Sequence, residues 1–245
     1  LVMVHGFTSS LETWDSVAAQ LSSDYRVIRL DLPGHGLTGP DAQGRYTNAD
    51  TVEFLSGFLD ALDIENPVIA GNSLGGLAAW RLAQKRPDDI SKLVLIAPGG
   101  FSINGVTETP VAVPLMVKLY LTKAPEAGVR QASAALLGDP NTLNEARVQT
   151  TIDMMKRPGN GDAMVARAGM FTLPNPVNDL AAVTAPALIL WGDKDVMVPP
   201  AQGQQFIAAM PNAQLMMLEN IGHVPQEEAP ILVAGAIREF IETQD

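Results

Sequence analysis

Residues 67–80 read Pro67-Val68-Ile69-Ala70-Gly71-Asn72-Ser73-Leu74-Gly75-Gly76-Leu77-Ala78-Ala79-Trp80. The apolar run before the first glycine predicts a buried strand, and the helical spacing of apolar residues predicts a helix over Leu74–Lys85. Between them, Gly-Asn-Ser-Leu-Gly predicts a sharp turn that exposes the hydroxyl of Ser73. Side chains at Gly71 and Gly75 would collide where the strand and the helix approach closely. The alternative interpretation is an ordinary glycine-rich turn in which Ser73 caps the helix.

Strand-like runs alternate with helical patterns at both ends of the chain. This alternation predicts an α/β fold with a mostly parallel sheet and helices on both faces. The predicted strands are Leu1–His5, Arg26–Asp31, Val68–Gly71, Leu93–Ala97, Ala187–Trp191 and Gln214–Leu218. The predicted helices are Leu11–Leu21, Asn48–Leu62, Leu74–Lys85, Ala201–Met210 and Ile231–Glu242. In such sheets ligands bind at the carboxyl ends of the strands, so the loops that follow them are where chemistry is expected.

The alternation stops over residues 101–173. This segment has helical apolar spacing and is bounded by the Pro- and Gly-rich breaks at 98–100 and 174–176. We expect a helical lid at 101–173 over an α/β core made of residues 1–100 and 174–245, because an insertion after this strand sits above the carboxyl ends of the sheet. The alternative is a plain helical insertion packed on the sheet.

Composition excludes several classes of protein. The chain has 245 residues, 47% hydrophobic content and no cysteine, so disulfides, thiolate metal sites and a cysteine nucleophile are ruled out. A formal net charge of −11 argues against nucleic acid, and no apolar run reaches membrane-spanning length. The chain starts in a strand-like run at Leu1, without an initiator methionine. We expect a cytoplasmic protein, with secretion behind a leader upstream of Leu1 as the alternative.

A serine hydroxyl needs a base to act as a nucleophile at neutral pH. His223 follows the last predicted strand and therefore lies at the same edge of the sheet as Ser73. The base in turn needs a carboxylate partner, and Asp193 and Asp195 both follow the strand before it. Either aspartate, or both, can also be turn residues. The order serine, aspartate, histidine is that of hydrolases built on this kind of turn.

A developing oxyanion needs two N–H donors. The backbone N–H of Leu74, directly after the candidate nucleophile, supplies one. The loop after the first predicted strand turns the backbone at His5-Gly6-Phe7, so the N–H of Phe7 is the second candidate.

Five motifs in this order resemble the α/β-hydrolase superfamily, in its lid-bearing serine esterase branch. They are His5-Gly6-Phe7, Asp31-Leu32-Pro33-Gly34-His35-Gly36, Gly71-Asn72-Ser73-Leu74-Gly75, Gly192-Asp193-Lys194-Asp195 and Gly222-His223. The resemblance implies a catalytic triad of Ser73, Asp195 and His223, with Asp195 chosen over Asp193, and needs no cofactor or metal. It makes His5 and His35 structural residues. The family has two further strands before its His-Gly-x strand, and residues 1–245 leave no room for them, so we expect a sheet that is short at one edge unless the true chain is longer.

The resemblance also implies acyl transfer, since related dehalogenases and epoxide hydrolases use an aspartate where this chain has serine. We expect a small-molecule carboxylic ester with apolar parts as substrate. The predicted pocket residues are Asn72, Met116, Met154, Met170, Val196 and Val224. One alternative is a carbon–carbon bond hydrolase of the meta-cleavage type; Asn72 favours it, Val224 replaces the aromatic residue common there, and a carboxylate-binding arginine would come from the lid. The candidates are Arg130, Arg147, Arg157 and Arg167. Another alternative is a ligand receptor on a hydrolase scaffold.

Overall fold

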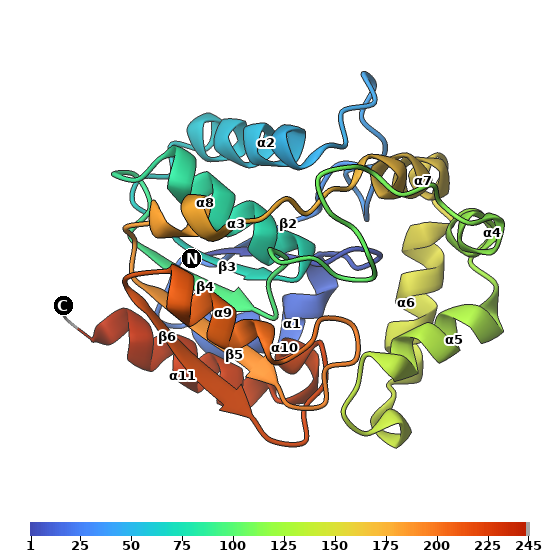
Figure 1. Ribbon diagram of the computed structural model, residues 1–245. Coiled ribbons are helices and arrows are strands. Elements are labelled where there is room, and N and C mark those ends of the chain that lie inside the picture. Colours follow the sequence, from blue (N-terminus) through green and yellow to red (C-terminus); the bar gives the residue numbers. More distant parts are fainter. Residues whose placement is uncertain (244–245) are drawn as a thin grey trace.

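The computed structural model of the protein describes residues 1–243, and a six-stranded sheet forms its centre (Figure 1). The strands lie in the order β2-β1-β3-β4-β5-β6, and every neighbouring pair is parallel. Their bounds are β1 Val2–Val4, β2 Ile28–Leu30, β3 Val68–Asn72, β4 Lys92–Ile96, β5 Ala187–Gly192 and β6 Ala213–Leu218. The first strand in the sequence, β1, therefore lies inside the sheet, with β2 on one side and β3 on the other.

Helices cover both faces of the sheet, as predicted, and bury an apolar core on each. On one face lie α2 (Asn48–Ala61), α3 (Leu74–Lys85), α8 (Val177–Ala181) and α9 (Gln202–Ala209). On the other lie α1 (Asp15–Leu21) and α11 (Pro230–Glu242), with a 3-10 turn at Leu11–Trp14 and the short α10 (Pro225–Glu228) at their edge. Trp80 and Trp191 are fully buried in the first core and Trp14 in the second. The predicted strands and helices are confirmed, apart from the 3-10 start of the first helix.

The segment between β4 and α8 folds apart from the sheet. Its helices are α4 (Leu115–Lys123), α5 (Glu126–Ala135), α6 (Glu145–Met155) and α7 (Asn160–Met170), with a 3-10 turn at Pro140–Thr142. They gather at the end of the sheet to which the strands point (Figure 1) and share a small apolar core of their own. We call these helices and their connections the α4–α7 segment.

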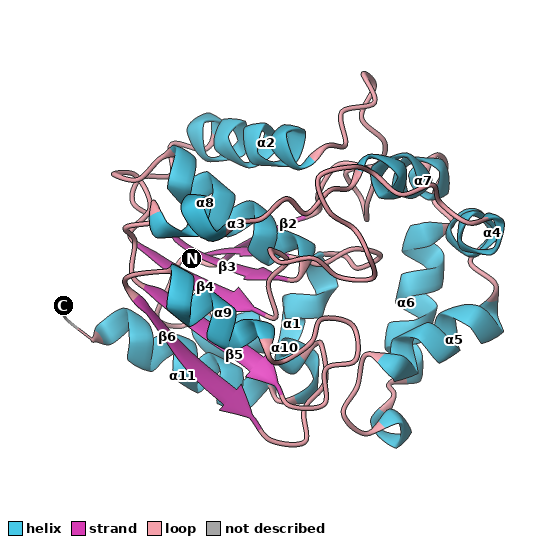
Figure 2. Cartoon of the chain, viewed as in Figure 1, coloured by secondary structure: helices cyan, strands magenta, loops and turns pink. Residues whose placement is uncertain are grey.

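The first part of the inserted segment, residues 101–114, is not helical, and the helices predicted for this segment begin at Leu115 (Figure 2). Pro110 and Pro114 explain this non-helical start, because proline removes a backbone donor and disfavours helix at the residue before it. The backbone N–H of Leu173 donates to the carbonyl of Thr107 at 2.7 Å, so the two ends of the inserted segment are held together.

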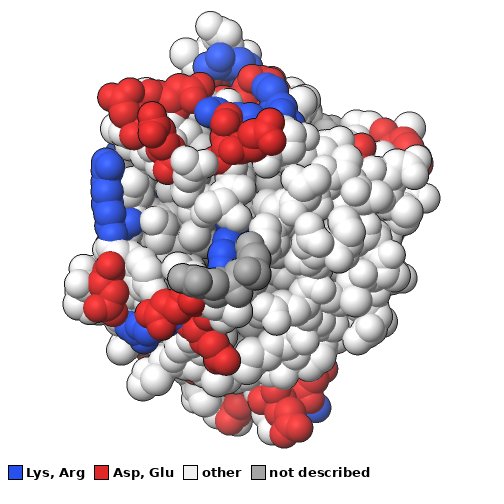
Figure 3. All heavy atoms as spheres, turned by 90° about the vertical axis from the view of Figure 1, so that its left-hand side faces the viewer, with Lys and Arg blue, Asp and Glu red and all other residues white. Residues whose placement is uncertain are grey.

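The face away from the α4–α7 segment carries mixed charge (Figure 3). Acidic groups gather in several places there with basic groups beside them. Ion pairs of this kind include those of Arg86 with Asp60 and Asp89. Among the described residues, no helix is both long and apolar enough to cross a bilayer.

Candidate active site

Ser73 lies at a strained turn between β3 and α3. Its φ of 53° is unusual for a residue with a side chain, and its hydroxyl makes no capping hydrogen bond to the helix. Ser73 therefore precedes α3 without capping it through its side chain. A backbone conformation that costs free energy turns the hydroxyl away from the helix, and Ser73 lines a cavity at the carboxyl edge of the sheet.

The glycines around Ser73 allow three backbone segments to meet. A Cβ at Gly71 would collide with the carbonyl of Gly75, and a Cβ at Gly75 would collide with the carbonyl of Val4 in β1. A Cβ at Gly76 would come within 2.8 Å of the Pro98 side chain. The glycine pattern is thus a packing requirement that seats α3 on β1 and β3.

We expect Gly75→Ala to lower the free energy of unfolding by about 3 kcal/mol or more, because its methyl group meets rigid backbone. Gly235 in α11 is exposed and has open space around it, so Gly235→Ala is the matched control. It should raise stability by about 0.5–1 kcal/mol through the better helix propensity of alanine. Urea unfolding of both variants tests the pair; equal effects would contradict the packing explanation.

His223 is bound to Asp195 beside Ser73. Its Nδ1 lies 2.7 Å from Asp195 Oδ2, and both side chains are buried. Because the carboxylate accepts the proton on Nδ1, the Nε2 of a neutral ring is left as the basic nitrogen. His223 and Ser73 line the same cavity. Within residues 1–243 their side chains make no direct hydrogen bond, a looseness common in unliganded sites.

The two candidate aspartates have different environments. The other oxygen of Asp195 accepts backbone N–H groups of Met197 at 2.8 Å and Val198 at 2.9 Å, so the carboxylate is locked in place. Asp193 is exposed; it accepts the N–H of Asn220 at 2.7 Å and lies 3.2 Å from the Lys194 ammonium. Only Asp195 contacts the histidine, and Asp193 is a turn residue.

The loop that carries His223 is held from two sides. The side-chain amide of Asn72 donates to the carbonyl of His223 at 3.0 Å, and the N–H of His223 donates to the carbonyl of Leu136 in the α4–α7 segment at 2.7 Å. Glu228 bridges the same two regions, accepting the N–H groups of Gly222 and Gly138. Burial raises the pKa of the Glu228 carboxyl.

Two backbone N–H groups are available beside Ser73. Leu74 is the first residue of α3, so its N–H has no acceptor within the helix. Phe7 follows β1 and also lines the cavity. Neither N–H donates to an acceptor among the described residues, so both are free to bind a developing oxyanion.

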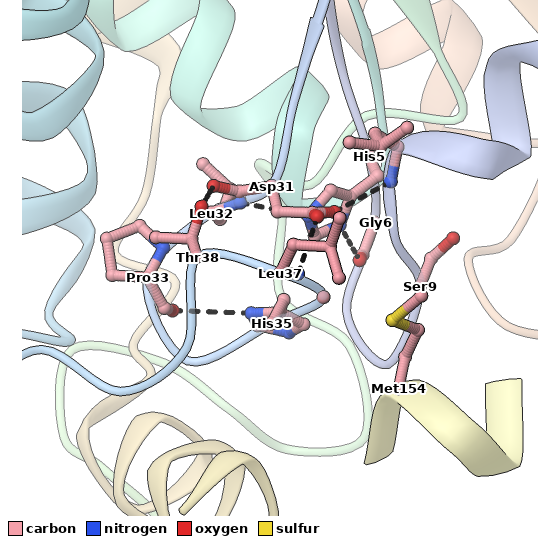
Figure 4. Close-up of polar contacts among 12 residues, drawn as sticks. His5, Gly6, Ser9, Asp31, Leu32, Pro33, His35, Leu37, Thr38 and Met154 are labelled. Carbon is pink, nitrogen blue, oxygen red and sulfur yellow. Dashed lines mark hydrogen bonds and ion pairs between the residues drawn. The ribbon is translucent and has the colours of Figure 1, made fainter. Parts of the chain in front are cut away.

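A buried polar cluster supports the Phe7 loop from behind (Figure 4). His5 pairs through Nδ1 with the carbonyl of Gly6 at 2.7 Å and accepts the N–H of Leu32 on Nε2 at 3.0 Å, which defines a neutral ring. Asp31 accepts the N–H groups of Leu11 and Leu37, each at 2.8 Å. His5 and His35 are buried here, away from the cavity lining, in the structural position that the motif implies.

Burial lowers the pKa of both His5 and His35 below the ordinary 6.5, and that of His35 well below it. As the pH falls through about 6.5, both histidines become protonated in the unfolded chain, whereas in the folded chain their lowered pKa values delay protonation to a lower pH. Stability is therefore full above about pH 6.5 and declines below it, by up to about 1.4 kcal/mol per pH unit for each proton.

Urea unfolding between about pH 7.5 and 5.5 measures this decline. His35→Gln is the matched variant and should reduce the slope by about one proton. A slope that is the same in both proteins would show that His35 is protonated in the folded state.

The cavity has a volume of about 400 Å³ and lies between the core and the α4–α7 segment. Its walls are mainly apolar. They include Phe7, Val117, Tyr120, Leu121, Leu136, Leu143, Met197 and Val224. Arg147 and Glu227 lie in the same wall.

Only part of the predicted pocket is found there. Asn72 and Val224 line the cavity, but the other four residues do not. Met116 and Val196 are each 73% exposed and Met170 is 39% exposed, because they lie on the outer side of their segments. Met154 reaches instead toward Ser9 (Figure 4). Helical spacing identifies the apolar residues of α4–α7, but it does not say which of them face the core.

Sequence reasoning missed Tyr120, Leu136, Met197 and Glu227 as wall residues. Met197 lies two residues after Asp195, and Glu227 lies four residues after His223. This closeness in sequence to the acid and the base could have indicated that both residues line the cavity. Among residues 1–243, no group of three His, Cys, Asp or Glu side chains is placed to hold a metal ion. The chemistry that the arrangement supports is nucleophilic attack by a serine with histidine as base.

A parallel sheet with a serine on a strained turn at its carboxyl edge, followed in sequence by an aspartate and a histidine, defines hydrolases of the α/β class. The family described as alpha/beta hydrolase fold matches residues 1–230, and the chain belongs to this family. The uncharacterized hydrolase YugF of Bacillus subtilis (strain 168) is 30% identical, covering 99% of this chain and 89% of the relative. A 2-hydroxy-6-oxononadienedioate/2-hydroxy-6-oxononatrienedioate hydrolase of Pseudomonas sp is also 30% identical, covering 93% of this chain and 82% of the relative.

Solved structures share the fold. The meta-cleavage product hydrolase of Pseudomonas fluorescens IP01 superimposes with a TM-score of 0.84 at 23% identity, over 98% of this chain and 89% of that one. A thermophilic esterase from Thermogutta terrifontis gives a TM-score of 0.76 at 24% identity, over 98% and 88%. These two likenesses concern the architecture alone.

Proposed function

We propose that this α/β hydrolase is a serine esterase that cleaves carboxylic esters of small to medium apolar substrates. The observation that carries the proposal is the buried His223–Asp195 pair, which opens on the same apolar cavity as Ser73. The cavity of about 400 Å³ suits a substrate of modest size. No cofactor or metal is needed for this chemistry.

The reaction has two halves. His223 takes the proton of Ser73 through Nε2 while Oγ attacks the ester carbonyl, and the N–H groups of Phe7 and Leu74 bind the oxyanion. The imidazolium then protonates the departing alcohol, leaving an acyl-enzyme on Ser73. Water activated by the same histidine releases the acid. Asp195 stabilises the imidazolium in both halves.

The α4–α7 segment supplies much of the cavity wall, and we propose that it acts as a lid. Val117, Tyr120, Leu136 and Leu143 come from it. It also contacts the base directly through the Leu136 carbonyl. Closure of such a segment over an ester excludes bulk water and strengthens the interactions with the oxyanion.

A second candidate is a carbon–carbon bond hydrolase. The 30% identity to the Pseudomonas dioate hydrolase favours it, as does Asn72 in the serine turn. The same serine, base and N–H donors would then act on a ketone carbonyl. A substrate of that class carries carboxylates, which the cavity would have to bind.

Steady-state hydrolysis of p-nitrophenyl esters from acetate to decanoate tests the first candidate. Cleavage of a coloured vinylogous 1,5-diketone acid, monitored by its absorbance, tests the second candidate. Turnover that peaks at short or medium acyl chains supports the esterase. Weak ester hydrolysis together with fast diketone cleavage would contradict the esterase proposal and support the carbon–carbon bond hydrolase.

A further inference from the structure

Arg147 brings a positive charge to the cavity wall, and that charge is already bound. Its Nε lies 2.9 Å and 3.0 Å from the two carboxylate oxygens of Glu227. Nη1 donates to Thr151 Oγ1 at 2.7 Å, and Nη2 donates to Ser9 Oγ at 2.9 Å. Each of the three guanidinium nitrogens thus has a protein acceptor.

Glu227 is held in place to make this pair. It lies in α10, four residues after the base, and Thr13 donates a hydrogen bond to it from behind. Thr13 is in turn fixed by the side-chain amide of Gln226 at 3.0 Å. The carboxylate is therefore oriented toward Arg147 before any ligand arrives.

Arg147 and Glu227 supply the formally charged side chains of the cavity lining. Among the described residues that line it, Arg147 is the sole lysine or arginine and Glu227 the sole carboxylate. Their side chains are 18% and 19% exposed, so they are largely shielded from water. The two formal charges of the pair cancel within a wall that is mainly apolar.

We propose that Glu227 is a specificity-determining residue: by occupying Arg147 it makes the cavity select uncharged substrates and reject those with a carboxylate. This inference rests on the proposed esterase function and narrows its substrate class to neutral esters. A carboxylate entering the cavity would lose its hydration and find the one cation engaged and an anion beside it. An uncharged acyl group meets neither cost.

The first test compares matched esters that differ in one charge. The p-nitrophenyl hemiesters of succinate and glutarate carry a terminal carboxylate, and the 4-oxopentanoate and 5-oxohexanoate esters replace it with a methyl ketone. In the wild type, kcat/KM should favour the ketones by about tenfold or more. Glu227→Gln frees Arg147 while keeping an acceptor for Thr13, and should lower that preference by about ten- to a hundredfold.

Two further variants exclude a general loosening of the site. The Arg147→Gln/Glu227→Gln double variant lacks the cation and should recover the wild-type preference. Arg147→Gln alone leaves an anion in the wall and should widen the discrimination against hemiesters. A wild type that accepts both ester types equally, or a preference unmoved by Glu227→Gln, overturns the inference.

The second test does not depend on turnover. Calorimetry on Ser73→Ala protein compares binding of hexanoate with hexanamide, with and without Glu227→Gln. Tighter binding of the amide that shifts toward hexanoate when Glu227 is replaced supports the inference. An unchanged ratio contradicts it. If the wild type hydrolyses no ester, the proposed function fails, and this binding ratio still decides the role of Glu227.

Discussion

Replacing Ser73 with alanine is expected to lower kcat for ester hydrolysis by on the order of 10⁴- to 10⁶-fold. The hydroxyl is the atom that forms the acyl-enzyme, so the reaction loses its covalent path and keeps only the binding and oxyanion contributions of the cavity. Alanine fits the same backbone turn, and the hydroxyl makes no hydrogen bond that supports the fold within residues 1–243. Stability should therefore change little. Stopped assays with p-nitrophenyl butyrate at high enzyme concentration measure the loss.

The matched control is Ser23→Ala, which removes an exposed hydroxyl far from the sheet edge and should leave kcat unchanged. His223→Ala alone should cost about as much as Ser73→Ala, and the double variant little more, because the two residues act as one unit. Additive losses, or turnover that survives in Ser73→Ala, would require a different nucleophile.

The architecture could be predicted because its signals are local. Each strand is a short apolar run beside a turn, and each core helix shows its buried face at helical spacing, as in Leu74–Lys85. In the inserted segment, the helical apolar spacing is local as well, but the helices begin only after Pro110 and Pro114. Proline is itself a local signal, and it accounts for the non-helical stretch before Leu115.

The reacting groups could also be placed from the sequence, since each follows a strand that ends at one edge of a parallel sheet. The structure distinguishes the two neighbouring aspartates by their contacts. Asp195 contacts the imidazole of His223, whereas Asp193 is exposed to solvent. The walls of the cavity could not be placed in this way. Which side of a helix faces the core depends on packing between segments, and this left Met116 outside and Tyr120 inside.

The Arg147–Glu227 pair also could not be predicted from the sequence, because it depends on packing between distant segments. Its partners lie 80 residues apart, one on α6 and the other on α10. Four arginines in residues 101–173 are equivalent in sequence, yet Arg130 pairs with acidic residues at the surface, and Arg167 is buried against backbone carbonyls. Burial lowers the pKa of Arg167 to about 10. Only the tertiary structure separates their roles.

The carboxylate that orients the base should be almost as important as the base. We expect Asp195→Asn to lower kcat by about 10³- to 10⁴-fold. An amide at this position either donates to His223 or loses its own backbone donors at Met197 and Val198. In the first case the ring loses the acceptor that keeps the proton on Nδ1, and in both cases it loses the negative charge that stabilises the imidazolium.

Asp193→Asn is the matched control, because it makes the same chemical change two residues away. Asp193 is exposed and bonded to the N–H of Asn220, which an asparagine oxygen also accepts, so kcat should fall by less than about tenfold. Steady-state kinetics of both variants on one ester, together with their urea unfolding curves, separates catalysis from stability. If Asp193→Asn were the more damaging variant, the carboxylate that acts on His223 in the transition state would be Asp193, and the 2.7 Å contact of Asp195 would be only a feature of the resting site.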